Sequence, residues 1–201
     1  MIDYIKNLLE HEAAAIRNIP VDENFEKAVA IIYEAVHVRK GKLIVSGMGK
    51  AGQIAQNIAT TFCSTGTPAV FLHPSDAQHG DLGLIAEHDA LLVISNSGKT
   101  REIIELIELA DRLYARLPLI VITGNCNSSI AQVAQACIST GNPAEVCPLG
   151  LTPSTSTTVM TVIGDALVVS MMKRIGFTSA EYAKRHHGGY LGDKSRFQAK
   201  L

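Results

Sequence analysis

The stretch that decides the fold is "ALLVISNSGKTREIIELIELADRL", residues 90–113. It opens with an unbroken run of apolar residues, passes through a loop of small residues around Gly98, and continues with apolar residues at helical spacing. A continuous apolar run is typical of a parallel strand that is buried on both faces of its sheet. The spacing after the loop predicts an amphipathic helix. The stretch therefore indicates one strand–loop–helix unit of an α/β fold.

The same alternation extends along the chain. Further apolar runs occur at 42–47, 68–73, 117–124 and 136–141, with helix-like segments between most of them. This rhythm predicts a doubly wound, three-layer α/β sandwich around a parallel sheet of about five strands. A long helix is expected over 154–175. In such folds ligands bind beyond the carboxyl ends of the strands.

The chain before the first strand has a different character. Residues 2–18 and 22–39 both repeat apolar side chains at helical spacing, with Pro20 between them, which predicts an N-terminal helical hairpin. We expect the chain to divide into this hairpin (1–39), which belongs to the same domain, the body of the domain (40–192) and a polar C-terminal tail (193–201).

Composition narrows the class of protein. The chain has 201 residues, of which 47% are hydrophobic and 18% charged, so it suits one domain with a sizeable core. Its formal net charge of -1 provides no global field that would attract nucleic acid or an anionic membrane. Any anionic ligand must therefore be held locally, by a few well-placed donors.

The sequence also bears on location. The four cysteines lack CxxC spacing, which favours buried thiols in a reducing compartment. The N-terminus has no basic region ahead of an apolar run, so it does not resemble a signal peptide. The most apolar helical segment, 159–172, contains Asp165 and is expected to be a core helix instead of a membrane span. We expect a cytoplasmic protein.

The loop in the opening stretch raises the question of a nucleotide site. Its "GKT" matches the end of a P-loop, but a P-loop needs glycine where this chain has Val93, inside the predicted strand. A nucleotide hydrolase is therefore excluded. Ser95, Ser97 and Thr100 remain, at the start of a predicted helix, where hydroxyl and N–H donors together favour a phosphate ester. The alternative is that Ser97 or Thr100 simply caps the helix.

A second glycine-rich loop, "GMGKAG" at 47–52, has the GxGxxG spacing of dinucleotide-binding proteins. The acidic residue that should end the next strand is missing, because that strand ends in "FLH" and Asp76 follows later. A nicotinamide site is therefore disfavoured. Lys50 lies where the helix dipole disfavours a cation, so it is either a solvated lysine or a partner for an anionic ligand.

Other polar residues are ambiguous on their own. His73, His79 and Asp81 match no zinc motif, and the histidines could bind sugar hydroxyls, act as acid or base, or lie in the core. The hydroxyl run "TPSTSTT" (152–158) could supply caps or solvated surface. His186, in "RHHGG", could belong to an exposed tail.

Taken together, these motifs resemble a known family. The segments "GMGKAG", "ATTFCSTGTPAVFLHPSDAQHGDLG", "ISNSGKTREI", "EVCPLGLTPSTSTT", "GDAL" and "HHGGYLG" occur in the order and spacing of the sugar isomerase (SIS) domain. Within that family the chain resembles the arabinose 5-phosphate isomerases, over about 40–192. The resemblance implies the SIS fold and the interconversion of D-ribulose 5-phosphate and D-arabinose 5-phosphate through an enediol. It implies no cofactor, and it places the reaction first in the synthesis of Kdo, a sugar of lipopolysaccharide.

The resemblance also implies roles for individual residues. The catalytic positions fall on Lys50, Glu102, Glu145 and His186. We expect Glu145 to be the base, with Glu102 as the alternative, and burial to raise the pKa of the base. Lys50 would stabilise the enediolate, and His186 would open the sugar ring or shuttle a proton. The implied substrate-binding residues are Ser46, Gly47, Gly66, Thr67, His73, His79, Ser95, Ser97, Thr100 and Ser154. No metal is required, although a histidine at His73 can take up inhibitory zinc in this family.

Three departures from the family pattern matter. Lys99 replaces a usual acidic residue, His187 replaces a usual proline, and the usual tandem CBS modules do not follow. The resemblance further implies a homotetramer in which one chain completes a neighbour's site. We hypothesise that CMP-Kdo competes at the isomerase site. Two alternatives stay open, namely an isomerase of another phosphosugar and a non-catalytic sugar-phosphate sensor.

Overall fold

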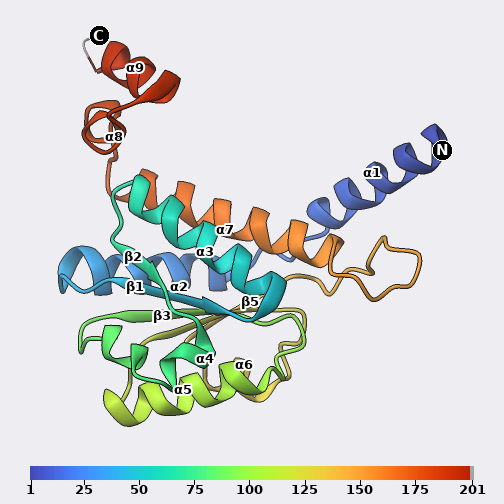
Figure 1. Cartoon of the computed structure of the whole chain (residues 1–201), viewed down its shortest axis with the longest axis horizontal. Helices are drawn as coiled ribbons and strands as arrows, with labels where there is room; N and C mark the ends of the chain where they lie inside the picture. The colour runs from blue at the N-terminus through green and yellow to red at the C-terminus, as the bar shows by residue number, and fades with distance from the viewer. Residues whose placement is uncertain (200–201) are drawn as a thin grey trace.

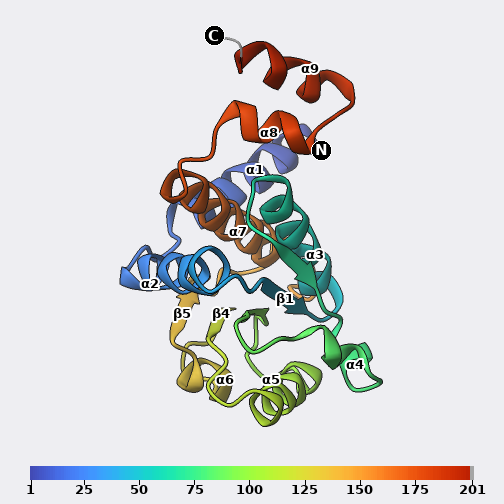
Figure 2. The same ribbon diagram turned by 90° about the vertical axis from the view of Figure 1, so that its left-hand side faces the viewer.

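The computed structural model describes residues 1–199 and has three layers, with helices on both faces of one parallel sheet (Figures 1 and 2). The strands lie in the order β2-β1-β3-β4-β5, and every pairing is parallel. The predicted doubly wound sandwich with five parallel strands is confirmed. The strands are β1 (Leu43–Gly47), β2 (Ala69–Phe71), β3 (Ala90–Ile94), β4 (Leu119–Thr123) and β5 (Ala136–Ser139).

Helices cover the two faces of the sheet. The helices on one face are α2 (Glu23–Ile32), α3 (Gly49–Ser64) and α7 (Thr155–Arg174). Those on the other are α4 (Pro74–Ala77), α5 (Arg101–Leu113) and α6 (Ser129–Val133), and a short 3₁₀ turn, η2 (Asp81–Leu84), follows α4.

The core explains why the strands are continuously apolar. In β3, Leu92 and Ile94 join the apolar cluster on one face of the sheet, whereas Leu91 and Val93 join the cluster on the other. Successive side chains of a strand point to opposite faces, so a sheet with two covered faces favours apolar residues at most positions of its strands.

The N-terminal helices differ from a closed hairpin. α1 (Ile2–Arg17) and α2 form on either side of Pro20, and α2 continues as a π-helical turn, η1 (Tyr33–Val38). α1 contacts α7 and extends away from the sheet, whereas α2 packs on β5 and α7 (Figure 1). Of the residues in α1, only Ala15 is buried. The expected hairpin is therefore open, because both helices find their main partners elsewhere.

The C-terminal region is more regular than expected. Two short helices follow Gly176, namely α8 (Ser179–Arg185) and α9 (Gly189–Gln198). The Thr178 hydroxyl caps α8 by accepting a hydrogen bond from the Glu181 N–H at 3.2 Å. The expected tail over 193–201 begins inside α9, and its last two positions, 200–201, lie outside the described residues.

α7 carries the predicted long apolar helix. By length and composition alone it could span a membrane, but half of its most apolar window is buried inside the fold. It packs tightly against α3 at Gly164, where an added Cβ would lie 2.4 Å from the Ile58 side chain. These contacts are those of a core helix.

The cysteines are free thiols, but the prediction that they are buried is wrong. Cys63 and Cys126 are exposed, whereas Cys137 and Cys147 are partly covered. Cys137 donates a hydrogen bond to the Cys126 sulfur at 3.5 Å. Burial, together with that contact, raises the pKa of Cys137 to about 12.

Candidate active site

A cavity of about 750 Å³ lies beyond the carboxyl ends of the central strands. The strand order reverses between β1 and β3, and a doubly wound sheet opens a crevice at that point. Its walls come from the loops after β1, β3 and β4 and from the segment that leads into α7. Five of the predicted site residues line it, namely Lys50, Ser95, Ser97, Thr100 and Glu145.

The loop between β3 and α5 forms the wall of the cavity that is the candidate for anion binding. Ser95 and Thr100 share a hydrogen bond between their hydroxyls at 2.9 Å, and the Ser97 hydroxyl accepts from the Lys99 N–H at 3.1 Å. Thr100 occupies the N-cap position of α5, yet its side chain makes no capping hydrogen bond. Helix capping therefore does not account for these hydroxyls. The start of α5 combines hydroxyls with the positive end of a helix dipole, which is a suitable site for a phosphate.

Gly98 shows how tightly this loop is packed. Its φ of +64° is a left-handed conformation, and an added Cβ would lie 2.3 Å from the Ser128 hydroxyl. The Asn125 amide donates to the Ser97 carbonyl at 3.2 Å, which ties the loop after β4 to the loop after β3. The candidate phosphate site is therefore held by two loops at once.

The structure also explains why the two nucleotide motifs are only apparent. Val93 is fully buried within β3, so the chain cannot curl there as a P-loop does. In "GMGKAG", an added Cβ at Gly47 would lie 2.7 Å from the Ala51 carbonyl oxygen, and one at Gly52 would lie 2.6 Å from that of Gly47. These glycines allow β1 and α3 to pack closely.

Glu145 is held by the residues that begin α7. Its Oε2 accepts hydrogen bonds from the Ser154 N–H at 2.7 Å, the Ser154 hydroxyl at 3.0 Å and the Ser156 N–H at 3.3 Å. Its Oε1 accepts from the Ser156 hydroxyl. Partial burial raises the pKa of Glu145, but these hydrogen bonds outweigh burial and leave the pKa below its ordinary value. The expectation of a raised pKa is therefore wrong, and the group is a carboxylate at neutral pH.

Ser156 lines the cavity and donates to Glu145, although the sequence did not single it out. It lies in the hydroxyl run 152–158, of which only Ser154 was predicted to take part. Ser154 does not line the cavity itself. Its hydroxyl donates a hydrogen bond to Glu145. The density of hydroxyls just ahead of a predicted helix was the available signal.

Two lysines also line the cavity. Lys50 lies in the first turn of α3, and Lys99 lies just before α5. Both residues are exposed. With Glu145 they give the cavity two cations and one carboxylate, a charge balance that suits an anionic ligand.

Other predicted residues near the same edge do not line the cavity. Glu102 lies in the first turn of α5 and is partly buried. His73 follows β2, with its Nδ1 3.7 Å from the Asp76 carboxylate, and His79 lies on the exposed loop after α4. Within residues 1–199, no three His, Cys, Asp or Glu side chains cluster as metal ligands would.

Three other predicted substrate-binding residues, Ser46, Gly66 and Thr67, do not line the cavity. The Ser46 hydroxyl is buried and donates to the Leu72 carbonyl at 2.6 Å. Gly66 and Thr67 precede β2, at the end of the sheet opposite the cavity. Thr67 is buried and hydrogen-bonds His37 at 3.1 Å.

His186 lies far from the cavity of its own chain. It follows α8, where its ring stacks on Tyr182 with centroids 3.7 Å apart. α7 separates α8 from the Glu145 segment, and its 20 residues span about 30 Å (Figure 1). A single chain therefore brings together the lysine, carboxylate and phosphate-binding groups, but not the histidine.

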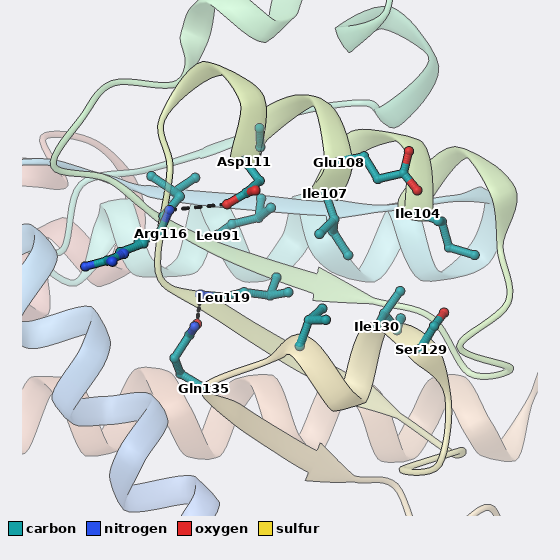
Figure 3. Close-up of a pocket in the computed structure, with 13 residues that line it drawn as sticks. Leu91, Ile104, Ile107, Glu108, Asp111, Arg116, Leu119, Ser129, Ile130 and Gln135 are labelled. Carbon is teal, nitrogen blue, oxygen red and sulfur yellow. Dashed lines mark hydrogen bonds between the residues drawn. The ribbon is translucent and has the colours of Figure 1, made fainter.

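A second cavity, of about 410 Å³, lies between α5, α6 and the sheet (Figure 3). Most of its lining is apolar, including Leu91, Ile107 and Ile130. At one end the Arg116 N–H donates to the Asp111 carboxylate at 3.2 Å (Figure 3). This arrangement offers no hydroxyl-rich anion site, so the first cavity is the better candidate for the active site.

The fold and the first cavity define a class of protein. The model of the SIS domain matches residues 38–170, and the chain therefore belongs to the SIS domain family. The resemblance seen in the sequence is confirmed.

Particular relatives narrow the comparison. The chain is 45% identical over 186 residues to the arabinose 5-phosphate isomerase KdsD of Shigella flexneri and to that of Escherichia coli K12. These matches cover 92% of the chain but 55% of each relative, so the chain spans about half the length of these relatives.

Solved structures also resemble this chain in fold and sequence. A Bacteroides fragilis protein, described as a candidate phosphosugar isomerase involved in capsule formation, is 66% identical with a TM-score of 0.93, and the match covers 94% of this chain and 99% of that one. An E. coli CFT073 protein in complex with arabinose 5-phosphate is 34% identical with a TM-score of 0.84, and the match covers 92% and 96%.

Proposed function

We propose that this chain is an aldose–ketose isomerase that interconverts D-ribulose 5-phosphate and D-arabinose 5-phosphate, the first step of Kdo synthesis for lipopolysaccharide. The observation that carries the proposal is the cavity that joins a hydroxyl-lined helix N-terminus to an ionised Glu145 and to Lys50. The KdsD relatives and the neighbour solved with arabinose 5-phosphate support the choice of substrate.

The β3–α5 loop would hold the phosphate of the substrate. Ser95, Ser97 and Thr100 offer hydroxyls beside the start of α5, and Lys99 adds a nearby positive charge. Anchoring the phosphate there fixes the sugar carbons relative to the rest of the cavity, which lowers the entropic part of the barrier.

Glu145 would act as the base. It would remove the proton from the carbon next to the carbonyl, and the electron pair would move into an enediolate whose oxygen Lys50 stabilises. A proton must also pass from the hydroxyl oxygen on one carbon to the enediolate oxygen on the other, a transfer that His186 would shuttle, and returning the first proton to the neighbouring carbon then gives the other sugar. Glu145 is favoured over Glu102 because Glu145 lines the cavity and Glu102 does not.

His186 would reach the cavity from a second copy of the chain, in a homotetramer. Two observations support this arrangement. In its own chain the histidine is separated from the cavity by the length of α7. α1 also exposes Ile2, Ile5 and Leu9, which are spaced to share one helix face, as an interface requires.

Several finer points belong to the same proposal. We place the enzyme in the cytoplasm, with 1–39 as part of the domain over 40–192. His73, beside Asp76, is the residue that would take up inhibitory zinc. CMP-Kdo would compete in the substrate cavity. Adding it to assays over a series of substrate concentrations should therefore raise the apparent KM.

The test is an NMR assay of ribulose 5-phosphate conversion in deuterated water. We expect arabinose 5-phosphate to form with deuterium on the carbon that received the proton. Glu145→Gln should lower kcat by roughly a hundredfold to ten-thousandfold, the usual contribution of a general base. Glu102→Gln, in α5, should lower kcat far less.

Two results would redirect the proposal. Turnover of a hexulose phosphate but not of ribulose 5-phosphate would assign a different sugar. Binding of ribulose 5-phosphate without any turnover would assign a sensor. Equal losses for Glu102→Gln and Glu145→Gln would contradict the choice of base.

A further inference from the structure

α1 lies mostly at the surface, yet it brings one carboxylate to the segment that holds Glu145. Oε1 of Glu12 accepts a hydrogen bond from the Thr155 hydroxyl at 2.8 Å. Oε2 of Glu12 is buried and has no hydrogen-bond partner among residues 1–199. Burying a carboxylate oxygen without a hydrogen-bond partner costs free energy. That cost suggests that the contact between Glu12 and Thr155 has a function.

Thr155 connects that carboxylate to the candidate active site. It is fully buried, begins α7, and lies between the two serines that hold Glu145. Its Oγ1 also accepts a hydrogen bond from the Val146 N–H at 3.2 Å. A hydroxyl has a single proton, so donating it to Glu12 turns the oxygen lone pairs toward Val146. The result is a chain of hydrogen bonds from Val146 through Thr155 to Glu12.

The position of Glu145 depends on contacts of this kind. Between the end of β5 and the start of α7, residues 140–154 form neither helix nor strand. No backbone ladder therefore fixes Glu145, and its side chain is oriented by Ser154 and Ser156, while its neighbour Val146 is held by Thr155.

We propose that Glu12 is a positioning residue of the active site. It orients the Thr155 hydroxyl, which holds Val146 and thereby keeps the Glu145 carboxylate in register with its serine donors. This inference rests on the proposed function of Glu145 as the base. It assigns the otherwise exposed first helix a part in catalysis.

The first test is kinetic. Glu12→Ala should lower kcat on the order of tenfold, because small displacements of a reacting group have effects of that size or larger. KM should stay nearly constant, because the phosphate-binding loop is a separate element. The acid limb of the pH–rate profile should move to higher pH as Glu145 loses donors. Glu12→Gln keeps an acceptor oxygen and should restore most of kcat.

The matched control is Glu10→Ala, which removes the same charge from an exposed position of the same helix. It should leave kcat and the pH profile as in the wild type. Thr155→Val, which keeps the shape of the side chain but removes the hydroxyl, should reproduce the Glu12→Ala loss. Thr155→Ser should not. These two variants keep the test decisive if Glu12→Ala fails to fold.

A second measurement does not depend on turnover. The Val146 amide proton, followed by NMR hydrogen exchange, should exchange faster in Glu12→Ala and Thr155→Val than in the wild type or Glu10→Ala. If Glu12→Ala lowers only the melting temperature, with wild-type exchange at Val146 and a wild-type pH profile, the inference is wrong. If the wild type shows no isomerase activity, the proposed function fails, while exchange at Val146 still decides whether the hydrogen-bond chain holds.

Discussion

The most informative single residue is Glu145. Its hydrogen bonds lower its pKa despite partial burial, which favours the ionised form but also makes it a weaker base than a carboxylate of ordinary pKa. As the proposed base, Glu145 must be both deprotonated and basic, and the donors Ser154 and Ser156 set the balance between these two requirements. Changing the number of donors therefore shifts that balance in a direction that can be measured.

Ser156→Ala tests this balance. The Ser156 hydroxyl donates to the charged form of Glu145, so its removal should raise the pKa of that group. The acid limb of kcat/KM should move to higher pH, and activity should fall more at pH 5 than at pH 8. Thr161→Ala is the control, because its hydroxyl donates only to the Thr157 carbonyl. An unchanged acid limb in Ser156→Ala would mean that another group controls it.

The same shift has a consequence for folding. A carboxyl whose pKa is lowered in the folded state contributes stability that is present above its unfolded pKa and is lost as pH falls through the folded value. In Ser156→Ala this contribution should shrink. The free energy of unfolding, measured by denaturant titration, should therefore differ from that of the wild type more at pH 7 than at pH 3.

At the scale of elements, the sequence predicts the sheet well. Each strand lies within its apolar run, because two buried faces leave few polar positions to confuse the pattern. The C-terminal helices were harder to predict, since α8 has only 7 residues and α9 has weak apolar periodicity. Periodicity also identified α1 as a helix without revealing that it packs on α7 and not on α2.

The site was predicted in part for similar reasons. Loops that follow central strands meet at one edge, so Lys50, Ser95 and Thr100 could be grouped from sequence. The function of Ser156 depends on which way Glu145 turns, and a hydroxyl run gives no sign of that direction.

The contact between α3 and α7 offers a prediction about packing. Gly164→Ala would gain about 1 kcal/mol of helix propensity. It would also place a Cβ 2.4 Å from the buried Ile58 side chain, and overpacking costs about 1–3 kcal/mol. We expect net destabilisation, seen as a melting temperature lowered by roughly 2–4 °C. Adding Ile58→Val should recover part of the loss, and a stabilised Gly164→Ala variant would contradict the clash.

At the scale of the whole molecule, the separation of His186 from the cavity leads to a complementation experiment. Glu145→Gln and His186→Ala should each be nearly inactive alone. Mixed, unfolded and reassembled together, they should regain activity, because a copy with an intact Glu145 can receive His186 from a neighbour. Glu145→Gln mixed with Lys50→Ala is the control and should stay inactive, because both residues belong to one chain's cavity. No recovery in the first mixture would contradict a shared site.

The two exposed lysines at the cavity mouth, Lys50 and Lys99, have a consequence for how quickly substrate arrives. The protein as a whole is almost neutral, so a sugar phosphate dianion feels little pull until it comes within roughly 10 Å, about the distance over which dissolved ions screen charge. Encounter should then accelerate over that last approach, and kcat/KM should decline with rising ionic strength while kcat holds steady.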